Sequence, residues 1–98
     1  MTDVKRIQSA VAAEFSISLA EILSANKLRC FARPRQVAMY LTRELTPLSL
    51  PRIGHAFGGR HHATVMHAIT RVTGLIAQDE TLAGQVAAVR AVLTEGGT

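Results

Sequence analysis

Residues 46–71, TPLSLPRIGHAFGGRHHATVMHAITR, have the pattern of two helices joined by a glycine turn. The hydroxyl of Ser49 can cap the first helix by accepting from the N–H groups of the following turn. Gly58 and Gly59 can adopt positive φ without steric cost, so the chain can leave one helix and enter the next at a steep angle. This order predicts a helix-turn-helix over about residues 49–78.

The second helix of this pair has one apolar stripe and a polar remainder. Its apolar residues recur at spacings of four, three and four: Val65, Ile69, Val72 and Ile76. Four polar residues fall outside that stripe: His61, Thr64, His67 and Arg71. Side chains at the start of the helix carry donors and acceptors of the length that reads base edges in a DNA groove. The pattern therefore favours a DNA-recognition helix.

Two motifs in order carry a family resemblance. The run IGHAFGGRHHATV, residues 53–65, follows ARPRQVAMYLTREL, residues 32–45. Together they resemble the C-terminal DNA-binding domain of the bacterial replication initiator DnaA, whose signature is I-G-x-x-F-G-G-R-D-H-T-T-V. The likeness extends from about Ile7 to about Ile76. It implies an all-α orthogonal bundle of about six helices, similar to that of the Trp repressor, which binds double-stranded DNA at a DnaA-box-like site in replication initiation or its regulation.

The resemblance also implies which residues read bases. His62 matches the family's base-contacting His, and Thr64 matches a Thr that contacts a phosphate or a base methyl. His61 replaces the usual Asp: a His can donate to guanine N7 or O6, whereas an Asp accepts from cytosine N4. Ala63 replaces a Thr but keeps a methyl group suited to thymine. We therefore expect altered preference at one or two base pairs of the site.

Further residues match positions that contact the DNA backbone. Lys27 matches a basic loop residue that enters the minor groove, although a solvated Lys is an equally good interpretation. The phosphate contacts implied by the resemblance fall on three residues: Arg35, Gln36 and Arg43. Four more residues complete the predicted surface: Arg29 in the same loop, Pro51 near the backbone, Arg52 and Arg60. Arg60 can hold a phosphate or can fix the turn by bonding carbonyls, and the sequence leaves both open.

The distribution of charge agrees with a polyanionic partner. The chain carries a net charge of +4, with a pI near 10.2. Residues 27–60 contain seven basic residues against Glu44 alone, a local net charge of +6. A solvated basic face would have the same composition. However, the basic segment coincides with the predicted helix-turn-helix, which favours a nucleic acid as the partner.

Length and composition indicate one small helical domain over residues 1–98. Apolar residues make up 48% of the chain and aromatic residues only 4%, so Leu, Ile, Val and Ala must build the core. Such a composition suits packed helices better than a sheet. Cys30 is the only cysteine, so no disulfide can form within the chain, and a reducing cytoplasm is the expected setting. The family resemblance implies that the chain is nucleoid-associated there.

No motif for catalysis, metal binding or nucleotide binding occurs in this sequence. The four His residues and Cys30 lack the spacing of a zinc site. There is no G-x-x-x-x-G-K-[ST] loop and no run of about 18 apolar residues. We therefore expect no enzyme activity, no cofactor, no metal, no bound nucleotide in this chain and no membrane segment.

Apolar spacing predicts the remaining helices. One should cover residues 3–15. A second should begin after Ser18, with Glu21 completing a capping box and Leu19, Ile22 and Leu23 facing inward. Residues 26–36 are expected to form an outward-pointing basic loop, and a third helix should cover 34–45, with Pro34 in its first turn. The last helix places four apolar residues on one face: Leu82, Val86, Val89 and Leu93. That face should pack on the domain, leaving a monomer or weak dimer.

Three functions stay open from the sequence. The chain can be the DNA-binding part of an initiator, or a regulator or competitor at the same boxes. It can also be a helical interaction module without a DNA role, which would bind an acidic protein through its last helix or its basic face.

Overall fold

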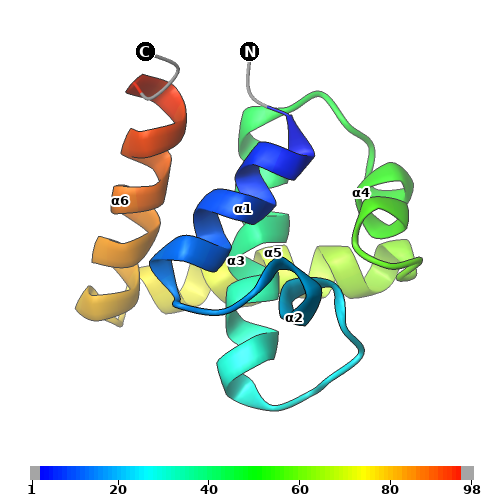
Figure 1. The fold of residues 1–98 in the computed structure, drawn as a ribbon, viewed down its shortest axis with the longest axis horizontal. Coiled ribbons are helices and arrows are strands. Elements are labelled where there is room, and N and C mark those ends of the chain that lie inside the picture. Colours follow the sequence, from blue (N-terminus) through cyan, green and yellow to red (C-terminus); the bar gives the residue numbers. More distant parts are fainter. Residues whose placement is uncertain (1–2, 96–98) are drawn as a thin grey trace.

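The fold is a bundle of six helices, seen in a computed structural model that describes residues 3–95 (Figure 1). The helices are α1 (Val4–Glu14), α2 (Leu19–Leu23), α3 (Arg29–Leu45), α4 (Leu50–Ala56), α5 (His62–Ile76) and α6 (Glu80–Glu95). No strand occurs in the described range. The predicted all-helical fold is therefore confirmed.

Helix α3 is the centre of the bundle and contacts α1, α2, α4 and α5. Figure 1 shows it upright in the middle, with α5 crossing it and with α4 and α6 at opposite sides. Val37, Ala38 and Leu41 are fully buried on this helix, so it presents apolar side chains to several neighbours at once. This position places the start of α5 beside α4 and its end beside α6 (Figure 1).

The first two helices both begin at side-chain caps, and that of α2 was predicted. Asp3 accepts a hydrogen bond from the backbone N–H of Arg6 at 2.9 Å, which caps α1. Ser18 and Glu21 form the reciprocal capping box of α2. Ile22 is fully buried as expected, but the expectation for Leu19 is wrong, because its side chain is 40% exposed. A helix of five residues can bury only a narrow face.

The predicted start of α3, at about Pro34, is five residues too late. The helix begins at Arg29, and Leu28 precedes it without a side-chain cap. Pro34 therefore lies inside the helix, in its second turn, and is buried. Proline usually disfavours helix in the residue before it, which is why the sequence suggested a loop through residue 33. Packing on the bundle overrides that local preference here.

Helix α6 packs back on the bundle as predicted. The four apolar residues predicted to face the domain are at most 4% exposed, against α1 and α5: Leu82, Val86, Val89 and Leu93. The guanidinium of Arg90 also donates to both carboxylate oxygens of Glu44 on α3, at 2.6 and 2.9 Å. The stripe that could have formed a dimer seam is thus occupied within the bundle.

Candidate nucleic-acid interface

The glycine turn, residues 57–61, wraps around one carbonyl oxygen, that of Gly54 on α4. The backbone N–H groups of Gly59 and Arg60 donate to it at 3.1 and 2.9 Å. Gly58 and Gly59 have φ angles of 89° and 79°, the left-handed region that side chains disfavour. The predicted helix-turn-helix, α4 and α5 joined by this turn, is therefore confirmed.

Gly54 is required by this geometry, and it was not singled out from the sequence. A Cβ atom on Gly54 would lie 2.1 Å from the carbonyl oxygen of Arg60, closer than any real contact. The turn lies directly on the backbone of α4 because Gly54 has no side chain. The sequence signal that could have identified Gly54 was its position in the I-G pair of the signature.

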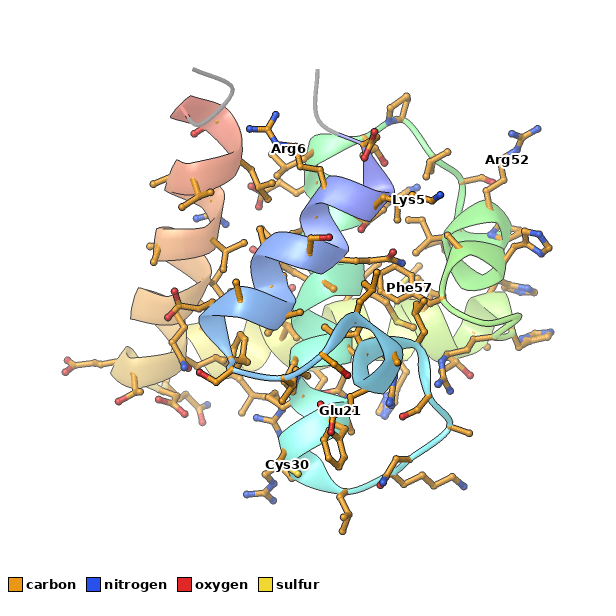
Figure 2. All side chains as sticks on the ribbon, in the orientation of Figure 1. Lys5, Arg6, Glu21, Cys30, Arg52 and Phe57 are labelled. Carbon is orange, nitrogen blue, oxygen red and sulfur yellow. The ribbon has the colours of Figure 1, made fainter. Side chains whose placement is uncertain are left out.

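The turn also depends on Phe57, the last residue before the glycines. Its backbone N–H donates to the carbonyl oxygens of Ile53 and Gly54, both at 3.2 Å. Its side chain is fully buried, and Figure 2 shows it pointing into the bundle. The turn is therefore anchored from inside, and α5 begins from a fixed point.

The first turn of α5 presents its side chains to solvent. His61, His62, Ala63 and Thr64 are all exposed, as a base-reading role requires. The ring centroids of His61 and His62 are 4.2 Å apart. His61 caps the helix, because its Nδ1 accepts from the backbone N–H of Ala63 at 3.1 Å. This hydrogen bond requires the tautomer in which Nε2 carries the hydrogen, so the outer edge of the His61 ring is a donor.

The loop that carries Lys27 is held against the helix-turn-helix. One Arg35 nitrogen, Nη2, donates to the carbonyl oxygen of Asn26 at 3.1 Å and to the hydroxyl of Ser24 at 3.4 Å. Arg60 Nη2 donates to the carbonyl oxygen of Ser24. The loop is thus fixed from both α3 and the glycine turn, so Lys27 and the first turn of α5 keep a set relative position.

Arg35 therefore lies elsewhere than the resemblance implied. Its side chain is only 6% exposed, and its Nε donates to the carbonyl oxygen of Ile22 at 2.7 Å. Burial lowers the pKa of the Arg35 guanidinium, and the nearby charge of Arg60 lowers it further. The structure corrects the expectation of a surface phosphate contact: Arg35 is a buried brace for residues 21–26.

The structure shows one of the two roles that the sequence left open for Arg60, the bonding of a carbonyl oxygen. It is half-buried, and Nη2 bonds to the loop, while Nε is buried without a hydrogen-bond partner in the described part of the chain. Arg60 also lines a hollow with Ala63 and Thr64 of α5. It fixes the turn and still borders the surface where α5 begins.

Three predicted contacts lie in the first half of α3 or in the loop before it. Lys27 is exposed in the loop, whereas Arg29 is exposed in the first turn of the helix and not in a loop. Gln36 is half-buried on the same helix, and its Oε1 accepts from Arg33 Nε at 3.2 Å. The three residues border a shared hollow together with residues of α5.

The other predicted contacts lie around the start of α4. Ser49 caps this helix by accepting from the N–H of Arg52 at 3.3 Å, and Pro51 lies exposed in its first turn. Arg52 is also exposed, and Figure 2 shows its side chain pointing away from the bundle. Arg43 is exposed and donates to the carbonyl oxygen of Leu48 at 3.3 Å, which leaves other donors free for a ligand.

Two kinds of feature are absent from the described residues. Within residues 3–95, no three His, Cys, Asp or Glu side chains gather as metal ligands. No helix in that range combines the length and the apolar character needed to cross a bilayer.

Comparisons with known proteins agree with this geometry. The family model described as "Bacterial dnaA protein helix-turn-helix" matches residues 4–72. The chromosomal replication initiator protein DnaA of Cereibacter sphaeroides is 46% identical over 90 residues, which cover 92% of this chain and 20% of that protein. The proteins of the same name from Gluconobacter oxydans and Bartonella quintana are 49% and 44% identical, over 92% and 94% of this chain and 19% of theirs. The chain thus spans about a fifth of the length of these relatives.

Proposed function

Because the chain belongs to the helix-turn-helix family of bacterial DnaA proteins, we propose that it binds double-stranded DNA at a DnaA-box-like site. A domain of this family is a binding module and not an enzyme. The names of the relatives support a role in the initiation of chromosomal replication or in its regulation.

The observation that carries the proposal is the exposed first turn of α5 at the end of an anchored glycine turn. In a helix-turn-helix, the N-terminal residues of the second helix enter the major groove and contact base edges. The four residues exposed there are those that match the family's base-reading positions: His61, His62, Ala63 and Thr64. Lys27, in the loop fixed to the same turn, then enters the neighbouring minor groove.

Phosphate contacts position the protein on the duplex without reading sequence. Five of the predicted cationic contacts are exposed or half-buried: Lys27, Arg29, Arg43, Arg52 and Arg60. Gln36 and Pro51 complete the proposed contact surface. Arg35 contributes from inside, by holding the loop in place.

A salt titration tests the proposed docking. If about five phosphates are neutralised, the logarithm of the affinity for a duplex should fall with log salt at a slope of roughly −4 or steeper. Fluorescence anisotropy with a labelled duplex between about 50 and 200 mM salt measures this slope. A slope near zero would contradict an interface that contacts the phosphates of the DNA backbone.

His61 should change the preferred site. With Nδ1 occupied by the helix cap, its outer donor favours guanine N7 or O6, whereas the Asp of the signature favours cytosine N4. We expect selection from a random duplex library to return a box changed at one or two base pairs, each worth about 1–3 kcal/mol. The variant His61→Asp keeps an N-cap residue and should move the preference back.

The variant His62→Ala provides a control for the same selection experiment. His62→Ala removes the side chain matched to base reading without touching the helix cap, and it should flatten the selected preference. If the intact chain and His61→Asp select the same unchanged box, the proposed role of His61 is wrong.

A further inference from the structure

The side of α6 that points away from the bundle carries no charge over most of its length. Between residues 81 and 94 the only charged residue is Arg90, which is engaged by Glu44 on α3. The exposed residues in this range, called here the outer face of α6, are small, apolar or hydroxylated: Thr81, Gly84, Ala87, Ala88, Ala91, Val92 and Thr94. The inner face of α6 is already packed on the bundle. A helix that is uncharged on nearly all sides is typical of one buried in a larger structure, so the outer face is a candidate interaction surface.

One row of the outer face has a shape that fits a second copy of itself. Gly84, Ala88 and Val92 follow one another at spacings of four residues, so they form a single row along the helix. A Cβ atom on Gly84 would meet nothing within 4 Å, so the row has a depression at this end. The side chain of Val92, 55% exposed, projects at the other end. A two-fold axis at Ala88 would therefore place Val92 of each copy over Gly84 of the other.

The charges at the two ends of this side are complementary under the same rotation. Helices α1 and α6 contact each other and run in opposite directions (Figure 1). Figure 2 shows Arg6 beside the last turns of α6, and the carboxylate of Asp3 at the same end is used to cap α1. Glu14, at the end of α1, and Glu80, at the start of α6, are exposed at the opposite end. The two-fold rotation reverses α6, so Arg6 of one copy would approach Glu14 and Glu80 of the other.

The size of this side indicates how strong such a contact can be. Helix α6 has 16 residues and α1 has 11, and a helix measures 1.5 Å per residue along its axis and roughly 10 Å across with its side chains. The two helices together therefore offer roughly 400 Å² per copy, or about 800 Å² in a dimer, which is in the range of weak, transient interfaces. A dimer formed here should therefore be weak.

We propose that the outer face of α6 binds a second copy of this chain, in a two-fold symmetric dimer with Ala88 at the axis. The small side chains around Ala88 allow the two helices to approach closely, and the charged ends fix their antiparallel direction. Helix α4 lies on the opposite side of the bundle from α6, so the glycine turn stays exposed in the dimer (Figure 1). The inference goes beyond the proposed function, in which such a dimer would carry two DNA-binding ends.

Two substitutions of Ala88 test the symmetry of the proposed contact. Sedimentation equilibrium of the intact chain should give an average mass that rises with concentration toward that of two chains. Ala88→Glu and Ala88→Lys should each weaken self-association by about 100-fold or more, because like charges then meet at the axis. An equimolar mixture of the two variants should associate again, because the introduced carboxylate and ammonium then face each other. Only a contact in which position 88 of one copy meets position 88 of the other predicts this recovery.

A matched control separates the contact from a general effect of charge. Ala20→Glu adds the same charge to an exposed alanine of α2 and should leave self-association unchanged. Because Ala88 is exposed, all three variants should keep the Tm of the intact chain, measured by circular dichroism at low concentration.

Three results would each overturn the inference. The first is an intact chain that stays monomeric up to about 1 mM, where even a contact of about 4 kcal/mol would be half-formed. The second is an Ala88→Glu variant that associates as well as Ala20→Glu. The third is a mixture of the two Ala88 variants that associates no better than either one alone. None of these measurements uses DNA, so each of these results leaves the proposed function standing.

Discussion

Gly54→Ala is expected to lower the free energy of unfolding by about 3 kcal/mol or more, which is the scale of severe overpacking in a closed site. The added Cβ would lie 2.1 Å from the carbonyl oxygen of Arg60. That oxygen cannot simply move away, because the N–H of Arg60 is bonded to the carbonyl oxygen of Gly54 at 2.9 Å. Urea unfolding followed by circular dichroism measures the loss as a lower midpoint. Duplex binding should be lost in proportion to the unfolded fraction.

Helix propensity alone predicts that Gly54→Ala should raise the free energy of unfolding, so the two explanations predict changes of opposite sign. Alanine is favoured over glycine inside a helix by about 1 kcal/mol. Gly74 in α5 and Gly84 in α6 provide matched controls, since a Cβ at either position meets nothing within 4 Å. Gly74→Ala and Gly84→Ala should therefore raise the unfolding midpoint slightly. If Gly54→Ala behaves like these two, the close approach of the glycine turn to α4 is not a constraint on the fold.

Local sequence patterns were enough to predict the helices and the glycine turn. Ser18 with Glu21, and Ser49 before α4, are caps whose partners lie three residues away, so the sequence alone identifies them. Gly58 and Gly59 were predicted to supply positive φ for the same local reason, and both do. Each of these features depends on atoms within one turn of the chain.

The errors fall where distant contacts decide the structure. Pro34 was expected in a first turn but lies in the second, because burial in the bundle overrides its local preference. Arg35 was expected on the surface, and no pattern of neighbouring residues showed that its donors would meet carbonyls 9 to 14 positions earlier in the chain. Gly54 was missed because the atom that forbids its side chain belongs to Arg60, across the turn.

In the proposed function, the position of Lys27 depends on such contacts. A loop residue that must meet a minor groove needs a fixed position relative to the recognition helix, because ordering a mobile loop on binding costs affinity. Arg35 and Arg60 supply that position, since both donate to the backbone of residues 21–26. The motif ARPRQ would then be needed for the geometry of the interface as well as for its charge.

Arg35→Met should therefore lower stability by about 2–4 kcal/mol, although a long side chain still fills the space. The carbonyl oxygens of Ile22 and Asn26 each lose an Arg35 donor, at 2.7 and 3.1 Å. Arg35→Lys should lose nearly as much, because an ammonium keeps the charge but lacks the planar fork that reaches several carbonyls. Urea unfolding of both variants against the intact chain measures these losses.

Duplex binding by Arg35→Lys then distinguishes two roles of Arg35: holding residues 21–26 in place, or contacting a phosphate directly. If Arg35 acts by holding the loop, the affinity of Arg35→Lys for the duplex should fall even at temperatures where this variant stays folded. Adding Lys27→Ala should then lower the affinity little further, because the loop is already released. Lys27→Ala in the otherwise intact chain should cost clearly more than it does in the double variant, a non-additivity that coupled residues show. A direct phosphate contact predicts the opposite pattern: Arg35→Lys would retain stability and charge, and the losses from the two sites would add. Additive losses with unchanged stability would return Arg35 to the contact surface that the family resemblance first implied.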